Sequence, residues 1–83
     1  MTRINQEIDV RSFYFRSGNN LKSFPRQIEW NGNFVTFAGE GLRYLVEQGG
    51  RAVQLFDMSD GSTTYRLRAD GQHWTLVGTR AGA

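Results

Sequence analysis

Runs of alternating apolar and polar residues, separated by turn-forming dipeptides, are the main pattern in this chain. The dipeptides are Asn31-Gly32, Gly49-Gly50, Asp60-Gly61 and Asp70-Gly71, and each lies between two such runs. They tolerate the positive φ angles that tight hairpin turns require. Short runs at this regular spacing are typical of antiparallel strands. The pattern therefore predicts an all-β fold, a single-domain antiparallel meander of six to seven short strands. To bury one of its faces, a sheet this small must form a strongly curved sheet or a small, partly open barrel.

Seven segments of the chain have the composition and alternation of strands. The predicted strands are residues 10–16, 21–30, 33–38, 42–48, 51–58, 62–68 and 72–77. Pro25 cannot donate to a ladder, so its segment is either an edge strand or a strand that begins after the proline. Segment 42–48 also fits one face of a helix, with Gly49 as its C-terminal cap. Seven residues are short for a helix, however, and a strand makes Gly49-Gly50 a hairpin turn, so a strand is favoured.

The two ends of the chain lack this pattern. Residues 1–9 are mostly polar and are expected to form a flexible N-terminal arm or an edge segment. Residues 79–83 are expected to be a disordered tail, which leaves 10–78 as the meander domain. A polar loop is expected at 17–20.

The turns also predict the register of the hairpins. Two-residue turns pair Ile28 with Val35, Val46 with Val53, and Leu67 with Trp74. The loop between segments 51–58 and 62–68 is different. An even number of residues in this loop would put Val53 and Leu55 on the face of Arg66 and Arg68. A three-residue loop at 59–61 instead gives one continuous apolar face, and its glycine suits the left-handed position of a bulge. We therefore predict the three-residue loop.

The predicted core follows from this register and is rich in large side chains, as a small domain needs. Its members are Phe13, Phe15, Ile28, Trp30, Val35, Phe37, Tyr44, Val46, Val53, Leu55, Tyr65, Leu67, Trp74 and Leu76.

Composition argues against catalysis and metal binding. The chain has no cysteine and one histidine, which excludes disulfides, thiol catalysis and thiolate metal sites. His73 is expected beside two arginines on a strand face, where a surface residue is the ordinary interpretation. Asp60 and Asp70 are accounted for by their turns. We therefore predict a protein that is not an enzyme and that has no cofactor and no metal.

No apolar run is long enough to span a membrane, and the first residues do not form a secretory signal. The expectation is a cytoplasmic protein without a membrane partner.

Two surfaces are candidates for binding. The first is a sheet face on which basic and aromatic side chains would alternate, as in proteins that bind single-stranded nucleic acid. Its predicted members are Arg43, Phe56, Arg66, Arg68 and His73. Glu47 on the same face and a net charge of only +2 weaken this hypothesis.

The second candidate is segment 10–16, which is dense in aromatic rings and flanked by charges. If uncovered, it would form an apolar patch or an edge that accepts a partner strand. The favoured function is a non-catalytic β binding module whose partner is another protein, through association with a different chain or with itself. The alternative is weak binding of single-stranded nucleic acid through the basic and aromatic face.

Overall fold

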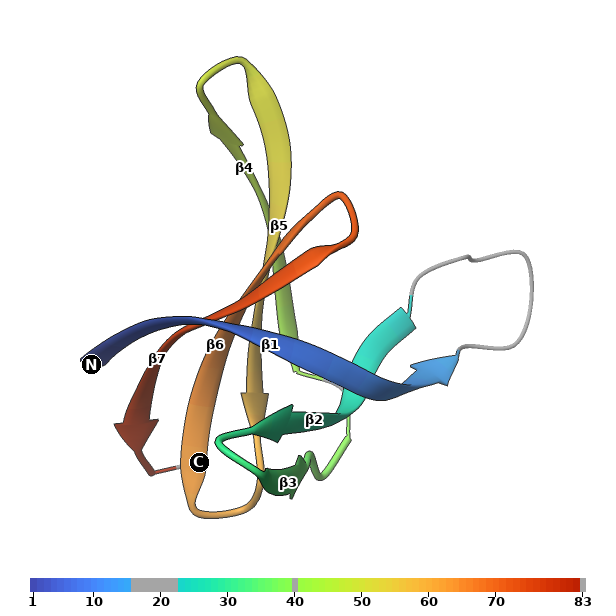
Figure 1. Ribbon diagram of the computed structural model, residues 1–83, viewed down its shortest axis with the longest axis vertical. Helices are drawn as coiled ribbons and strands as arrows, with labels where there is room; N and C mark the ends of the chain where they lie inside the picture. The colour runs from blue at the N-terminus through green and yellow to red at the C-terminus, as the bar shows by residue number, and fades with distance from the viewer. Residues whose placement is uncertain (16–22, 40, 83) are drawn as a thin grey trace.

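The computed structural model describes residues 1–15, 23–39 and 41–82 and confirms the all-β prediction. All the described strands belong to one antiparallel sheet, which curves around its core and does not close into a barrel (Figure 1). The strands are β1 (Thr2–Phe15), β2 (Ser23–Trp30), β3 (Asn33–Thr36), β4 (Leu42–Gln48), β5 (Arg51–Ser59), β6 (Thr63–Asp70) and β7 (His73–Ala81). The predicted loop at 17–20 lies outside the described residues, as does the side chain of Phe15.

The order of strands in the sheet is β3-β2-β1-β7-β6-β5-β4. The first and last strands therefore pair with each other, with Thr2 opposite Thr79 and Ile8 opposite Trp74. The two edges of the sheet are β3 and β4, which follow one another in the chain. The chain just after β3 contacts the end of β5, where the Ala38 N–H donates to the Ser59 carbonyl oxygen at 2.8 Å.

Both ends of the chain belong to this sheet, in contrast to the expected arm and tail. Residues 2–8 pair with β7, and β7 continues through Thr79 and Arg80 to Ala81, opposite Thr63. The strands extend past the predicted boundaries at 10 and 78 because each end pairs with another strand of the sheet. Local composition does not contain that information. Residues 2–8 pair with β7 alone, which agrees with the edge segment that was the alternative to an arm.

Two hairpins have the predicted register. Ile28 lies opposite Val35 across a turn in which Asn31 and Gly32 have φ angles of 52° and 75°. These values fit the type I′ turn, which requires positive φ at both central positions. Val46 lies opposite Val53, so segment 42–48 is a strand, as favoured.

The β6–β7 hairpin differs by one residue from the prediction. Its turn is at Gly71-Gln72, so Trp74 lies opposite Ala69 instead of Leu67. Because the pairing moves by two positions, each residue keeps its predicted face. Tyr65 and Trp74 both face the core cluster.

The β5–β6 loop is longer than predicted and reverses the faces of β5. Ser59 lies opposite Thr64, which leaves four residues, 60–63, between the last paired residues of β5 and β6, although Thr63 already pairs with Ala81 of β7. As a result Phe56 and Met58, and not Val53 and Leu55, join Leu67 on the face that packs inward.

The core reflects this change. Its buried residues are Ile8, Phe24, Ile28, Phe37, Phe56, Met58, Tyr65, Leu67, Ala69 and Leu76. Phe56 is at the centre of the ring contacts, with its centroid 5.4 Å from that of Trp74 and 5.8 Å from that of Phe24. The predicted core residues Tyr44, Val46 and Leu55 lie on the opposite face of the sheet, as does Val53, which is nevertheless buried.

Pro25 lies inside β2, opposite Phe13 of β1. β3 pairs only with residues 27–30 of β2, so β2 is the outermost strand at the proline. This agrees with the requirement that a strand proline lie where a ladder bond is not needed.

Candidate functional site

The predicted basic and aromatic face is not assembled in the structure. We call the face that carries Phe56 and Leu67 the core face, and the opposite one the outer face. Arg43 lies opposite Phe56 and therefore points to the core face. Arg66 and Arg68 alternate with the core residues of β6 and point to the outer face.

His73 is also on the outer face, since it is opposite Asp70. The five predicted residues are thus divided between two sides of the sheet, and the prediction that they share one face is wrong. The cause is the four-residue loop at 60–63, which reverses β5 and β4 relative to β6. Phe56 is only 2% exposed, so its ring is not available for stacking on a base.

Arg66 forms an ion pair on the outer face with Asp57 of β5. Its Nε and terminal nitrogen donate to the two carboxylate oxygens at 2.8 and 2.9 Å. The hydroxyl of Tyr44 donates to the same carboxylate at 3.2 Å, and the Arg66 guanidinium lies 6.0 Å from the centre of the Tyr44 ring. The hydrogen bonds from Arg66 lower the pKa of Asp57, and those to Asp57 raise the pKa of Arg66. The carboxylate neutralises most of the charge of this guanidinium, so the attraction of Arg66 for a phosphate is weakened.

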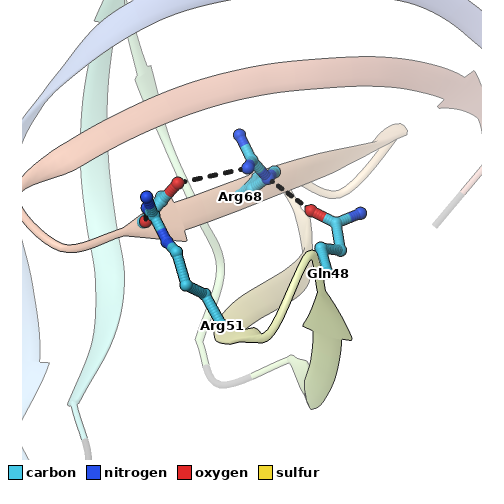
Figure 2. A network of polar contacts seen from close by, with 4 residues as sticks. Gln48, Arg51 and Arg68 are labelled. Atoms are coloured by element: carbon cyan, nitrogen blue, oxygen red, sulfur yellow. Dashed lines mark hydrogen bonds and ion pairs between the residues drawn. The ribbon is translucent and has the colours of Figure 1, made fainter.

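Arg68 belongs to a second polar network, at the turn of the β4–β5 hairpin (Figure 2). It donates to Gln48 at 3.1 Å and to Asp70 at 3.2 Å, and Asp70 also binds Arg51. Val53, on the same face of β5, is 1% exposed. The long side chains of the network therefore cover this valine and fix the hairpin to β6.

His73 lies apart from both networks and contacts Glu7 of β1 at 3.2 Å. The two side chains are largely exposed. In the part of the chain that the structure describes, no three histidine or acidic side chains gather in a way that could hold a metal ion.

Two hollows lie next to β4. One, of about 150 Å³, is on the core face and is lined by Phe13, Arg43, Gln54 and Trp74. The other, of about 350 Å³, lies where β3 ends and is lined by Gly41, Asp57 and Arg80 among others. Gly41 has no room for a β-carbon there, because the Asp57 carbonyl occupies that position.

β4 is an edge strand with exposed apolar side chains. Leu42 is 61% exposed, Leu45 70% and Tyr44 39%, and β4 pairs with β5 alone. Soluble proteins usually protect such an edge with charged side chains, proline, a bulge or a covering segment. β4 carries two charged residues, Arg43 and Glu47, but it has no proline, and all seven of its residues pair with β5 without a register shift.

The register shows which backbone groups of β4 are unpaired. Gln48 and Arg51 flank the two-residue turn and therefore form a hydrogen-bonded pair. In an antiparallel ladder, hydrogen-bonded and non-hydrogen-bonded pairs alternate. The N–H and C=O groups of Arg43, Leu45 and Glu47 therefore point away from β5, where the described part of the chain offers them no strand.

Sequence reasoning considered a second edge, at segment 10–16. In the structure residues 9–15 of β1 pair with β2 and not with β7, whose pairs with β1 end at Ile8. One side of residues 9–15 therefore has no strand partner in the described part of the chain, while the outermost strands of the sheet are β3 and β4. A signal was present in the sequence, because Leu42, Tyr44, Leu45 and Val46 place apolar side chains on both faces of one strand. The same pattern occurs in β5, an inner strand that buries Val53 on one face and Phe56 on the other, so it does not by itself identify an edge.

Comparisons with known proteins give no further guide: no family model matches the chain, and no curated protein or solved structure matches it. Over the described residues, the structure contains no helix that is long and apolar enough to cross a membrane.

Proposed function

We propose that this chain is a non-catalytic protein-interaction module that binds an extended strand along the free edge of β4. Backbone hydrogen bonds from Arg43, Leu45 and Glu47 would provide affinity, and the exposed side chains of Leu42, Tyr44 and Leu45 would provide contact area. A cytoplasmic location is part of this proposal.

The observation that supports the proposal is the exposed apolar surface along this regularly paired edge. Three large apolar side chains are exposed on seven consecutive, regularly paired residues. The other edge strand, β3, has only four residues, with Phe34 exposed. A regular and apolar edge tends to pair with another strand. In a functional protein, that strand would belong to a specific binding partner.

Binding of single-stranded nucleic acid is the alternative, and the hollow between Arg43 and Trp74 is the observation that favours it. An indole ring beside a guanidinium is an arrangement that nucleic-acid-binding proteins use. The two functions differ in salt dependence, because binding to phosphates weakens steeply as salt rises, whereas strand pairing and apolar contact do not.

Site-specific photo-crosslinking in the native cell tests the proposed function. A photoreactive amino acid replaces Leu45 on the β4 edge, and the same amino acid replaces Phe34 on the β3 edge as the matched control, since both side chains are exposed. The expected result is a protein adduct from position 45 that resists nuclease and high salt, with none from position 34. Equal capture at the two positions, or adducts lost on nuclease treatment, would refute the proposal.

A further inference from the structure

We infer that the strand bound by β4 is the β4 strand of a second copy of this chain, in a symmetric antiparallel dimer. This inference rests on the proposed function and names its partner. It comes from the sequence of β4, Leu42–Gln48, which is complementary to itself when two copies run in opposite directions.

The unpaired backbone groups restrict the register. Only Arg43, Leu45 and Glu47 have free N–H and C=O groups on the open side, so these residues must form the hydrogen-bonded pairs between copies. The register that overlaps the whole strand puts Leu45 opposite Leu45 of the second copy. It puts Arg43 opposite Glu47 of the second copy, and Glu47 opposite its Arg43. Each of these pairs exchanges two backbone hydrogen bonds.

The charges agree with this register. Arg43 and Glu47 have no ion pair with any other described residue, unlike Asp57, Arg66 and Asp70. In the dimer each would lie directly opposite its counterion, on the same face and on either side of the central leucines. Opposite charges at directly facing positions stabilise antiparallel pairs, and like charges destabilise them.

The apolar residues agree as well. On the outer face Tyr44 lies opposite Val46 of the second copy, an aromatic and β-branched pair of the kind that stabilises sheets. On the core face the two Leu45 side chains meet, and each is 70% exposed in the single chain. In Figure 1 the β4–β5 turn lies at the end of the molecule away from β2 and β3, so a second copy can approach β4 there.

Symmetry explains why such an assembly would stop at two copies. An interface in which the same patch serves both subunits is closed, and it uses the β4 edge completely. The remaining edges are the two short β3 strands, of four residues each. The dimer would thus cover the long open edge of the monomer.

Charge reversal on the full chain tests the dimer and its register together. Arg43→Glu and Glu47→Arg each put two like-charged pairs across the interface, and we expect each to raise the dimer dissociation constant at least about tenfold in sedimentation equilibrium. The double variant restores both pairs in reversed order and is expected to dimerise like the natural chain. Arg3→Glu changes the net charge by the same amount as Arg43→Glu, at an exposed site on β1, and is the matched control. Circular dichroism verifies that each variant keeps the fold.

Mixing the two single variants gives a sharper result. The Arg43→Glu chain offers two acidic side chains and the Glu47→Arg chain two basic ones, so the mixture should form a heterodimer that neither forms alone. Because the chain has no cysteine, Leu45→Cys adds a second test of register. Hydrogen-bonded partners have Cα atoms about 5.5 Å apart, within disulfide range, so the introduced thiols should link two copies under mild oxidation. Gln48→Cys, whose partner would be Leu42, should not link.

A natural chain that stays monomeric at every soluble concentration overturns the dimer, as do single reversals without effect or a double variant that stays monomeric. The crosslinking experiment then separates the two ideas. A monomeric chain that captures a different protein at position 45 refutes the dimer and retains the proposed function. A monomeric chain that captures nothing there refutes both.

Discussion

Asp57 is the most highly connected carboxylate on the outer face. It accepts hydrogen bonds from both Arg66 donors and from the Tyr44 hydroxyl, and its side chain is mostly buried. Its pKa is lowered from the ordinary value of 3.8, chiefly by the hydrogen bonds from Arg66, with burial opposing in part. A carboxyl whose pKa is lower in the folded state stabilises the fold above its unfolded pKa, and that stabilisation is lost as the pH falls through the folded value.

We therefore predict that Asp57→Asn lowers the free energy of unfolding by about 1–2 kcal/mol at neutral pH, because Arg66 loses its charged partner. Urea unfolding monitored between neutral pH and strong acid measures this. The difference from the natural chain should begin to shrink as the pH falls below about 4, where the carboxyl of the unfolded chain takes up a proton, and should be lost once the pH passes the lowered pKa of the folded chain. Asp9→Asn removes one exposed carboxylate and is the charge-matched control. A difference that stays constant down to strong acid would show that the ion pair is not its source.

At the scale of elements, the four-residue loop at 60–63 has the largest effect on the molecule, because its length decides which face of β5 is buried. Asp60 holds the loop. One carboxylate oxygen accepts the N–H groups of Ser62 at 2.9 Å and Thr63 at 2.8 Å, and the other accepts the Tyr65 hydroxyl at 3.3 Å. The backbone hydrogen bonds lower the pKa of Asp60.

Asp60→Ala removes all of these acceptors, and we predict a loss of about 1 kcal/mol in the free energy of unfolding. Asp60→Asn retains one side-chain oxygen for the two N–H groups and should lose less than half as much. Urea unfolding at neutral pH compares the two variants. Equal losses would mean that the charge of Asp60, and not its bonds to the backbone, stabilises the loop.

The same loop marks the limit of prediction from the sequence at this scale. Hairpins whose turns have two residues, such as Asn31-Gly32, can be assigned a register from the turn alone. The loop after β5 could contain an odd or an even number of residues. An odd number was chosen because it gave one continuous apolar face, and that criterion was wrong. The better signal was local: an aspartate followed by glycine, serine and threonine can bond to the N–H groups two and three residues later. With that loop, Phe56 and Met58 belong in the core, and Arg43 is separated from Arg66 and Arg68.

At the scale of the whole molecule, strand positions could be predicted but the arrangement of the two ends could not. Turn residues and alternation are local properties, and they placed all seven strands within a few residues, apart from the extended ends of β1 and β7. The pairing of β1 with β7 depends on which edges remain unsatisfied after the hairpins have formed. For that reason the candidate site at β4 was found only from the structure.

This order predicts the behaviour of a circular permutant. Joining the two ends of the chain with a short flexible linker and opening it after Gly39 gives the sequence order β4-β5-β6-β7-β1-β2-β3, which is the order in the sheet. The permutant should keep the circular dichroism spectrum, melt within about 5–10 °C of the natural chain, and refold faster because all its strand pairs are local.

A permutant opened between Gly49 and Gly50 is the control. It cuts the β4–β5 hairpin, so it should be markedly less stable than the permutant opened after Gly39. If the permutant opened after Gly39 fails to fold, the connection from β3 to β4 contributes more to the stability of the sheet than the closure of a short loop would.

The pairing of the first strand with the last also affects how the protein is made. Residues 2–8 are synthesised before the other strands of this sheet, yet their only ladder partner is β7, which is synthesised after them all. Until then the nascent chain presents an unpaired β1 segment and an unpaired flank of β6 to the cell, and both are open to mispairing. Translation rate and chaperone access while β7 is being made should therefore govern the yield of the native sheet more than events while β1 is being made.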